Sequence, residues 1–135
     1  MQKTMTMFLS SMVLLVMMAV FASAAPKDDD VMSKQDGMYV VNTTTLGKDV
    51  IGYVSPTPLK IYIKKNKVVK IEFLKNQETP KYFARVKKAM LNKWDGLKVA
   101  EAEKLKVDGV TGATFSSDAV KKNVELGLQY YKKHK

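Results

Sequence analysis

The sequence predicts an α+β domain, in which an antiparallel sheet of about four strands packs against two main helices. Three observations support this prediction. Residues 38–73 are rich in β-branched and alternating apolar residues, and apolar stripes at helical spacing follow in residues 82–94 and 120–131. All the strands precede all the helices, which is typical of helices packed on an antiparallel sheet rather than of alternating units around a parallel one.

The first two predicted strands are residues 38–45 and 49–55. Both are rich in β-branched residues, which strands favour. Pro56 and Pro58 follow them, and proline lacks the backbone N–H group that a central strand needs. We therefore expect two short strands and a break in the chain before the next one.

Residues 59–64 and 67–73 form the next two predicted strands, because apolar and polar residues alternate in both. Lys65 and Asn66 separate them, and asparagine tolerates the left-handed conformation that a tight turn requires. We therefore expect a hairpin. The alternation in its second strand predicts three core-facing residues, Val69, Ile71 and Phe73.

The first predicted helix lies between Thr79, a good N-cap, with Pro80 at the first helical position, and Gly96, which suits the position just past the end. Its apolar stripe comprises Tyr82, Phe83, Val86, Ala89, Met90 and Trp94. Residues 97–107 are ambiguous. The stripe of the second helix comprises Val120, Val124, Leu128 and Tyr131.

The composition excludes several functions. The chain has no Cys, so thiol chemistry and Cys-ligated metals are impossible, and its single His134 lies in the basic tail, which argues against a Ser-His-Asp relay or a His-ligated metal. The net charge of +10 comes from 22 Lys and one Arg, Arg85. Nucleic-acid binding proteins favour the forked guanidinium group, so we expect a lysine-rich surface and no nucleic acid partner.

The N-terminus predicts export. Lys3 precedes the apolar stretch 8–21, and the small residues Ala22, Ser23 and Ala24 have the spacing that a signal peptidase reads. We therefore assign residues 1–24 to a signal peptide, residues 25–36 to a flexible leader, and an extracytoplasmic location to the mature chain. No stable membrane insertion is expected after cleavage. An uncleaved membrane anchor is the alternative, whereas the lack of Cys excludes a bacterial lipid anchor.

A segment rich in small residues and hydroxyl groups, from Asp108 to Ser117, leads into the last helix. Small residues let the backbone approach a ligand closely, and the free N–H groups at a helix start attract a phosphate. Because Thr and Ser are also ordinary N-cap residues, plain capping is the alternative interpretation of this segment.

The residues Asp108-Gly109-Val110-Thr111-Gly112-Ala113-Thr114 match the motif Asp-x-x-(Ser/Thr)-Gly-Ala-(Thr/Ser) of the FMN-binding domain family. This family includes the C subunit of the sodium-translocating NADH:quinone reductase and the G subunit of Rnf complexes. The chain resembles the compact form of the domain over residues 38–132, through the hairpin, residues 76–80 after it, and the spacing to the motif. We therefore assign residues 37–135 to an FMN-binding domain.

The resemblance implies that a flavin transferase links FMN through its phosphate to Thr114. It also implies that Asp108, Thr111, Gly112 and Ala113 complete the recognition sequence. Among the aromatic residues that could contact the flavin ring, Tyr53, Tyr82, Phe83, Trp94 and Phe115, we favour Phe115 and expect Phe83 and Trp94 in the core. Ser116 is the remaining predicted cofactor-binding residue.

These inferences predict an extracytoplasmic carrier of electrons between membrane or periplasmic redox proteins. We expect no catalytic residue and no metal site, because no placed acid–base groups are evident in the sequence. Two alternatives remain open: a small reductase that binds FMN without a covalent bond, and a cofactor-free secreted module whose lysines bind anionic partners.

We expect the mature protein to begin at Ala25, because the apolar stretch is shorter than the roughly 20 residues of a spanning helix and ends in a cleavage signal. Intact-mass measurement of the exported protein tests this. Recovery of the full-length chain in the membrane fraction alone would contradict it.

Overall fold

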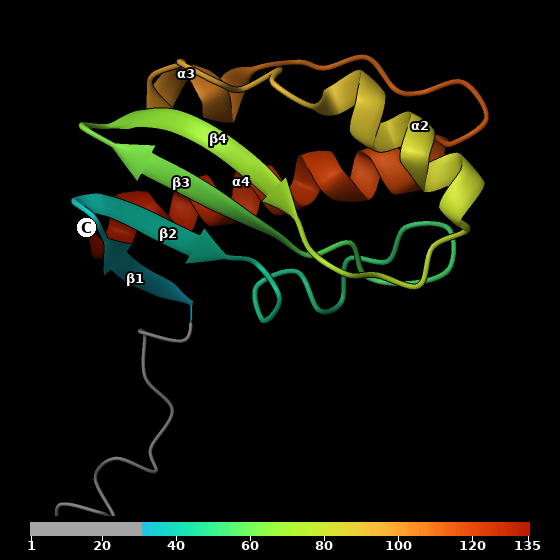
Figure 1. The fold of residues 1–135 in the computed structure, drawn as a ribbon, viewed down its shortest axis with the longest axis horizontal. Coiled ribbons are helices and arrows are strands. Elements are labelled where there is room, and N and C mark those ends of the chain that lie inside the picture. The colour runs from blue at the N-terminus through green and yellow to red at the C-terminus, as the bar shows by residue number, and fades with distance from the viewer. Residues whose placement is uncertain (1–30) are drawn as a thin grey trace, which may run out of the picture.

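The computed structural model describes residues 31–135, so the predicted signal peptide and the first half of the leader lie outside the described residues. Four strands and three helices follow one another (Figure 1). Their bounds are β1 Met32–Gln35, β2 Met38–Asn42, β3 Leu59–Lys64, β4 Lys67–Phe73, α2 Pro80–Met90, α3 Val99–Lys104 and α4 Thr114–His134. The predicted α+β class is confirmed.

The sheet is an antiparallel meander with the strand order β1-β2-β3-β4. Helix α4 runs along one face of the sheet and contacts β2 and β3, while α2 and α3 each contact α4 (Figure 1). The core fills the space between α4 and the sheet. None of the helices within residues 31–135 has the length and apolar character that crossing a membrane requires.

Gly127 allows α4 to lie very close to the sheet. A Cβ atom at this position would lie 2.5 Å from Ile61 Cδ1 and 3.1 Å from Thr43 Cγ2, so a larger residue would force these side chains or the helix to shift. Val124 and Leu128, on either side of this contact, are completely buried. This packing fixes the position of α4 and therefore of its first turn, Thr114 to Ser117.

The first two predicted strands are only partly right. Strand β2 ends at Asn42, because the Asn42 side-chain oxygen accepts hydrogen bonds from the Thr44 N–H group at 2.9 Å and the Thr44 hydroxyl at 2.6 Å, and this local turn replaces strand pairing. Residues 49–55 form a loop that contains one isolated bridge, between Ile51 and Pro56. The remaining strand, β1, lies within the predicted flexible leader and pairs with β2.

The predicted hairpin of β3 and β4 is confirmed. Lys65 and Asn66 form its turn with φ angles of 51° and 61°, the left-handed values of a two-residue type I′ turn. The register shifts within the hairpin, because Ile63 pairs with Val68 whereas Tyr62 pairs with Lys70. Val69 is therefore an extra residue, a β-bulge, that no residue of β3 faces.

The bulge overturns one predicted core position. Val68 is 1% exposed and Val69 is 41% exposed, so the buried residue is the one that the alternation placed on the outer face. Ile71 is buried as expected. Phe73 is half-buried and packs edge-on against Phe83.

Helix α2 ends at Met90, earlier than the predicted end near Gly96. Asn92 has a φ angle of 71°, and a residue in the left-handed conformation ends an α-helix. Trp94 is buried but reaches the core from the turn after α2, while Tyr82 is 43% exposed. The helix thus contributes a narrower apolar face than predicted, formed by Phe83, Val86 and Met90.

Val68→Asp should unfold or badly destabilise the domain, since a buried carboxylate without a partner costs several kcal/mol, comparable with a total stability of about 5–15 kcal/mol. Val69→Asp, in the neighbouring exposed position, is the matched control and should change the free energy of unfolding by less than about 0.5 kcal/mol. Urea unfolding of both variants tests the register. A larger loss for Val69→Asp would show that the bulge is misplaced.

Candidate functional site

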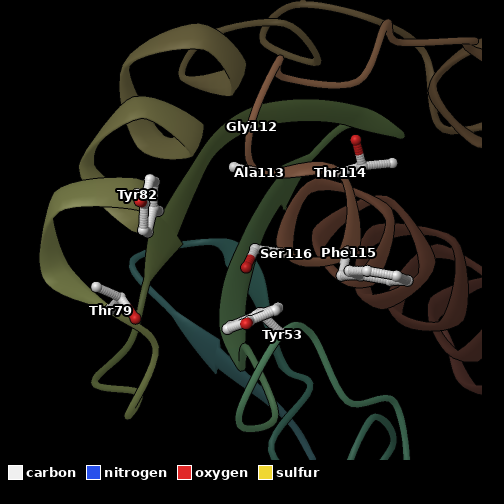
Figure 2. A pocket seen from close by; sticks show the side chains of 8 residues that line it. All are labelled: Tyr53, Thr79, Tyr82, Gly112, Ala113, Thr114, Phe115 and Ser116. Carbon is white, nitrogen blue, oxygen red and sulfur yellow. The ribbon is translucent and has the colours of Figure 1, made fainter.

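A cavity of about 400 Å³ opens beside the first turn of α4 (Figure 2). Three segments that lie far apart in the sequence form its walls: the loop between β2 and β3, the start of α2, and the end of the 108–114 motif. The lining residues are Tyr53, Thr79, Tyr82, Gly112, Ala113, Thr114, Phe115 and Ser116. A cavity of this size can enclose much of a small cofactor.

Helix α4 begins without a side-chain cap. Ala113 is the N-cap residue, Thr114 is the first helical residue, and no side chain accepts a hydrogen bond from the first turn. Among residues 31–135, the backbone N–H groups of Thr114, Phe115 and Ser116 have no acceptor. Plain capping is therefore not observed, and the free N–H groups form a site that favours a negatively charged group.

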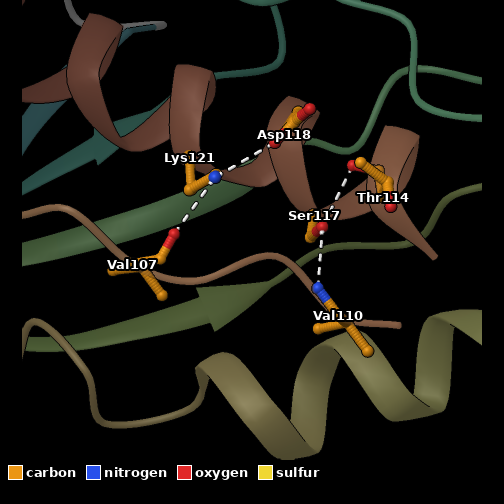
Figure 3. Close-up of polar contacts among 6 residues, drawn as sticks. All are labelled: Val107, Val110, Thr114, Ser117, Asp118 and Lys121. Atoms are coloured by element: carbon orange, nitrogen blue, oxygen red, sulfur yellow. Dashed lines mark hydrogen bonds and ion pairs between the residues drawn. The ribbon is translucent and has the colours of Figure 1, made fainter. Parts of the chain in front are cut away.

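Ser117 holds the motif against α4 (Figure 3). Its hydroxyl donates a hydrogen bond to the Thr114 carbonyl oxygen at 3.0 Å and accepts one from the Val110 N–H group at 3.3 Å. Further along the helix, Lys121 donates to the Val107 carbonyl oxygen at 3.1 Å and forms an ion pair with Asp118 at 3.0 Å. The segment before α4 is thus tied to the helix at two points.

The hydroxyl of Thr114 remains free. Within the described part of the chain it has no hydrogen-bond partner, and the residue is exposed. Figure 2 shows Thr114 at the rim of the cavity, with its hydroxyl turned away from Tyr53 and Ser116. An alcohol in this position can be reached from solvent.

The buried carboxylate of Glu78 connects the walls of the cavity. Its Oε1 atom accepts hydrogen bonds from the Tyr53 N–H group at 2.7 Å and the Ser116 hydroxyl at 2.9 Å. Its Oε2 atom accepts from the N–H groups of Val54 at 2.7 Å and Ser55 at 3.3 Å. These four donors satisfy a carboxylate that is only 5% exposed, and they bind the 53–55 loop to the first turn of α4.

Gly52 is required for this arrangement. A Cβ atom at Gly52 would overlap Glu78 Oε1 and would lie 3.2 Å from Ser116 Cα. The loop can therefore approach both the carboxylate and α4 only because this residue has no side chain.

Three aromatic side chains surround the cavity. Tyr53 and Phe115 are 70% and 66% exposed, and their ring centroids lie 6.4 Å apart with a tilt of 32° between the planes. Tyr82 lies on the opposite side, on α2 (Figure 2). Exposed aromatic rings around a cavity suit a flat, apolar ligand. Phe83 and Trp94 are buried in the core, as expected.

The structure brings most of the predicted site residues together. Gly112, Ala113, Thr114, Phe115 and Ser116 all line the cavity. The Ser116 hydroxyl, however, is engaged by Glu78 and is not free for a ligand.

Two predicted residues lie elsewhere. Asp108 faces a separate hollow, between the end of α2 and residues 105–110, and Thr111 is exposed and does not line the cavity. Their side chains are therefore accessible from outside, and neither of them forms the wall against which a ligand would pack.

Three site residues were not predicted from the sequence: Gly52, Glu78 and Thr79. Thr79 lines the cavity, and the other two shape it from behind. No sequence pattern marks Glu78 as a site residue, because three of its four hydrogen-bond donors are backbone N–H groups 23 to 25 residues away in the sequence. Residues 31–135 contain no group of three or more acidic or His side chains that could hold a metal ion.

This geometry defines a small α+β domain built to hold a flat, phosphate-bearing cofactor between aromatic side chains and an uncapped helix. The sequence model of the FMN-binding domain family matches residues 52–129, more than half of the chain, and the protein belongs to this family. All three walls of the cavity lie within the matched residues. No curated protein and no solved structure matches the chain.

The cofactor of this family is FMN, and the cavity fits it. Tyr53, Tyr82 and Phe115 offer flat surfaces to the isoalloxazine ring, and the free N–H groups of α4 offer donors to the phosphate. When bound, FMN supplies redox chemistry that none of the described side chains can perform. Membership of an FMN-binding family argues against the alternative of a cofactor-free binding module.

Glu78→Gln should lower the free energy of unfolding by about 2 kcal/mol, because an amide in place of the buried carboxylate leaves backbone donors without an acceptor. Hydrogen exchange of the Tyr53 and Val54 amides should accelerate at the same time. Glu72→Gln is the control, since Glu72 is exposed and, within residues 31–135, bonds only the Tyr62 hydroxyl. Unchanged exchange at Tyr53 and Val54 would show that Glu78 does not hold the loop.

Proposed function

We propose that this protein is an exported electron carrier whose FMN is bonded through its phosphate to Thr114. The observation that carries this proposal is the exposed, unbonded Thr114 hydroxyl beside the uncapped first turn of α4. Thr114 is the last residue of the motif that resembles a flavin attachment sequence, and it lies in a domain that belongs to an FMN-binding family.

The attachment reaction takes FMN from FAD. A bond forms between the Thr114 Oγ1 atom and the flavin-side phosphorus, the bond from that phosphorus to the bridging oxygen breaks, AMP leaves, and the hydroxyl proton passes to a base of the flavin transferase. The free N–H groups of the first turn of α4 would be available to stabilise the negative charge on the phosphate. The product is a phosphodiester that keeps the cofactor on the protein outside the cell.

The exposed motif residues suit recognition by the transferase. Asp108 and Thr111 do not line the cavity, yet both residues are exposed in the chain segment that leads to Thr114. Their role is therefore contact with the maturing enzyme rather than contact with the flavin.

The residues that line the cavity favour the function of an electron carrier over that of an enzyme. Apart from the two tyrosines, no titratable side chain among the described residues lines it, and the nearby Glu78 carboxylate is fully engaged by four donors. The described residues of the cavity therefore offer no free carboxylate, imidazole or amine to exchange protons with an organic substrate. The partners that this proposal implies are redox proteins of the membrane or periplasm, and the signal peptide predicted for residues 1–24 supplies the export.

Thr114→Ala should abolish covalent flavin. The protein is co-expressed with a flavin transferase, denatured and run on a gel, and flavin fluorescence should remain with the wild-type polypeptide only. Thr111→Ser, which keeps the motif pattern, is the control and should retain the signal, and Thr114→Ser should retain it because the reaction needs an alcohol.

A fluorescent band from Thr114→Ala would refute the attachment site. Wild-type protein that releases all its FMN on denaturation would instead indicate the alternative, a reductase with reversibly bound FMN, and turnover of purified protein with a substrate would then establish it.

A further inference from the structure

The only arginine of the chain lies beside the cavity. Arg85 belongs to α2, and a Cβ atom placed on Gly112 would lie 3.6 Å from its Nη1 atom. The guanidinium carbon also lies 5.9 Å from the centre of the Tyr82 ring. Gly112 and Tyr82 both line the cavity, on two of its three walls, so the guanidinium group lies near both of these walls.

The guanidinium group of Arg85 has no acidic partner. The three ion pairs within residues 31–135 are all formed by lysines, and no hydrogen bond from Arg85 occurs in this part of the chain. Its five N–H donors are therefore free. The chain has 22 lysines, so positive charge alone does not distinguish this position. What arginine adds is a planar guanidinium group, which can bind two phosphate oxygens at once.

We infer that Arg85 binds the phosphate of FMN and makes this site selective for phosphorylated flavins. The inference rests on the proposed function, because it requires FMN in the cavity with its phosphate at Thr114. The Cα atoms of Gly112 and Thr114 are at most about 7 Å apart, so a phosphate on Thr114 lies within reach of a guanidinium group beside Gly112.

Two groups of donors then meet the phosphate from different elements. The backbone N–H groups of the first turn of α4 would be one group, and the guanidinium group of α2 would be the other. Gly112, which lies near Arg85, has a positive φ angle of 82°. Riboflavin has the same ring but no phosphate, so it gains nothing from either group.

The single arginine makes a direct test possible. Mature protein without an affinity tag, labelled with ¹⁵N, has one arginine Nε–Hε signal in its NMR spectrum. We expect this signal to shift on addition of FMN and to be shifted in protein loaded by a flavin transferase. Riboflavin should shift the amide signals of Tyr53 and Phe115 and shift the arginine signal much less than FMN does.

Affinities measured by quenching of flavin fluorescence complete the test. Arg85→Ala should weaken FMN binding by about tenfold or more and leave riboflavin binding unchanged, since a charge-assisted hydrogen bond is lost only for FMN. The FMN affinity of Arg85→Lys should lie between those of the wild type and Arg85→Ala. Lys88→Ala, which removes an exposed cation from the same helix, is the control and should bind both flavins as the wild type does.

The outcomes separate this inference from the proposed function. An unmoved arginine signal in protein that carries FMN, or equal FMN affinity of Arg85→Ala and wild type, overturns the role of Arg85 and leaves the carrier intact. A wild-type protein that neither binds FMN nor accepts it from the transferase overturns the proposed function, and the inference falls with it.

Discussion

The cavity depends on a single buried charge, the Glu78 carboxylate. Moving a carboxylate out of water is expensive unless strong hydrogen bonds replace its hydration, and here four donors from two separate segments do so together. Neither the 53–55 loop nor the first turn of α4 can satisfy the charge alone. The walls of the cavity therefore form as one unit, because the cost of burial is offset only when all of them are in place.

Helix α4 holds the walls of the cavity in position. Gly127 brings it into close contact with β3, and the buried Asn123 side chain donates hydrogen bonds to the Ala119 carbonyl oxygen at 2.9 Å and to Thr57 Oγ1 at 3.2 Å. The helix is thus tied both to the sheet and to the loop that carries Tyr53. These contacts fix the helix beneath the exposed aromatic rings of the cavity.

Local patterns predicted the parts of this fold that local forces decide. The Lys65–Asn66 turn, the existence of α2 and the motif before α4 follow from residue types and spacing. Val69 could not be placed, because the bulge depends on how β4 pairs with β3. Strand β1 has a polar sequence and forms only because β2 offers it an edge. Glu78 was missed for a similar reason, since its donors come from distant parts of the chain.

The uncapped start of α4 has a consequence for maturation. Ala113 is the N-cap residue, a position where most helices carry a side chain that accepts hydrogen bonds. Alanine in place of such a residue lowers the stability of a helix by about 1 kcal/mol. The apoprotein accepts this cost, and a phosphate bonded to Thr114 would supply the missing acceptor. If FMN is bonded to Thr114 as proposed, the cofactor would also act as the cap of the helix, and the flavin-loaded protein would be harder to unfold than the apoprotein.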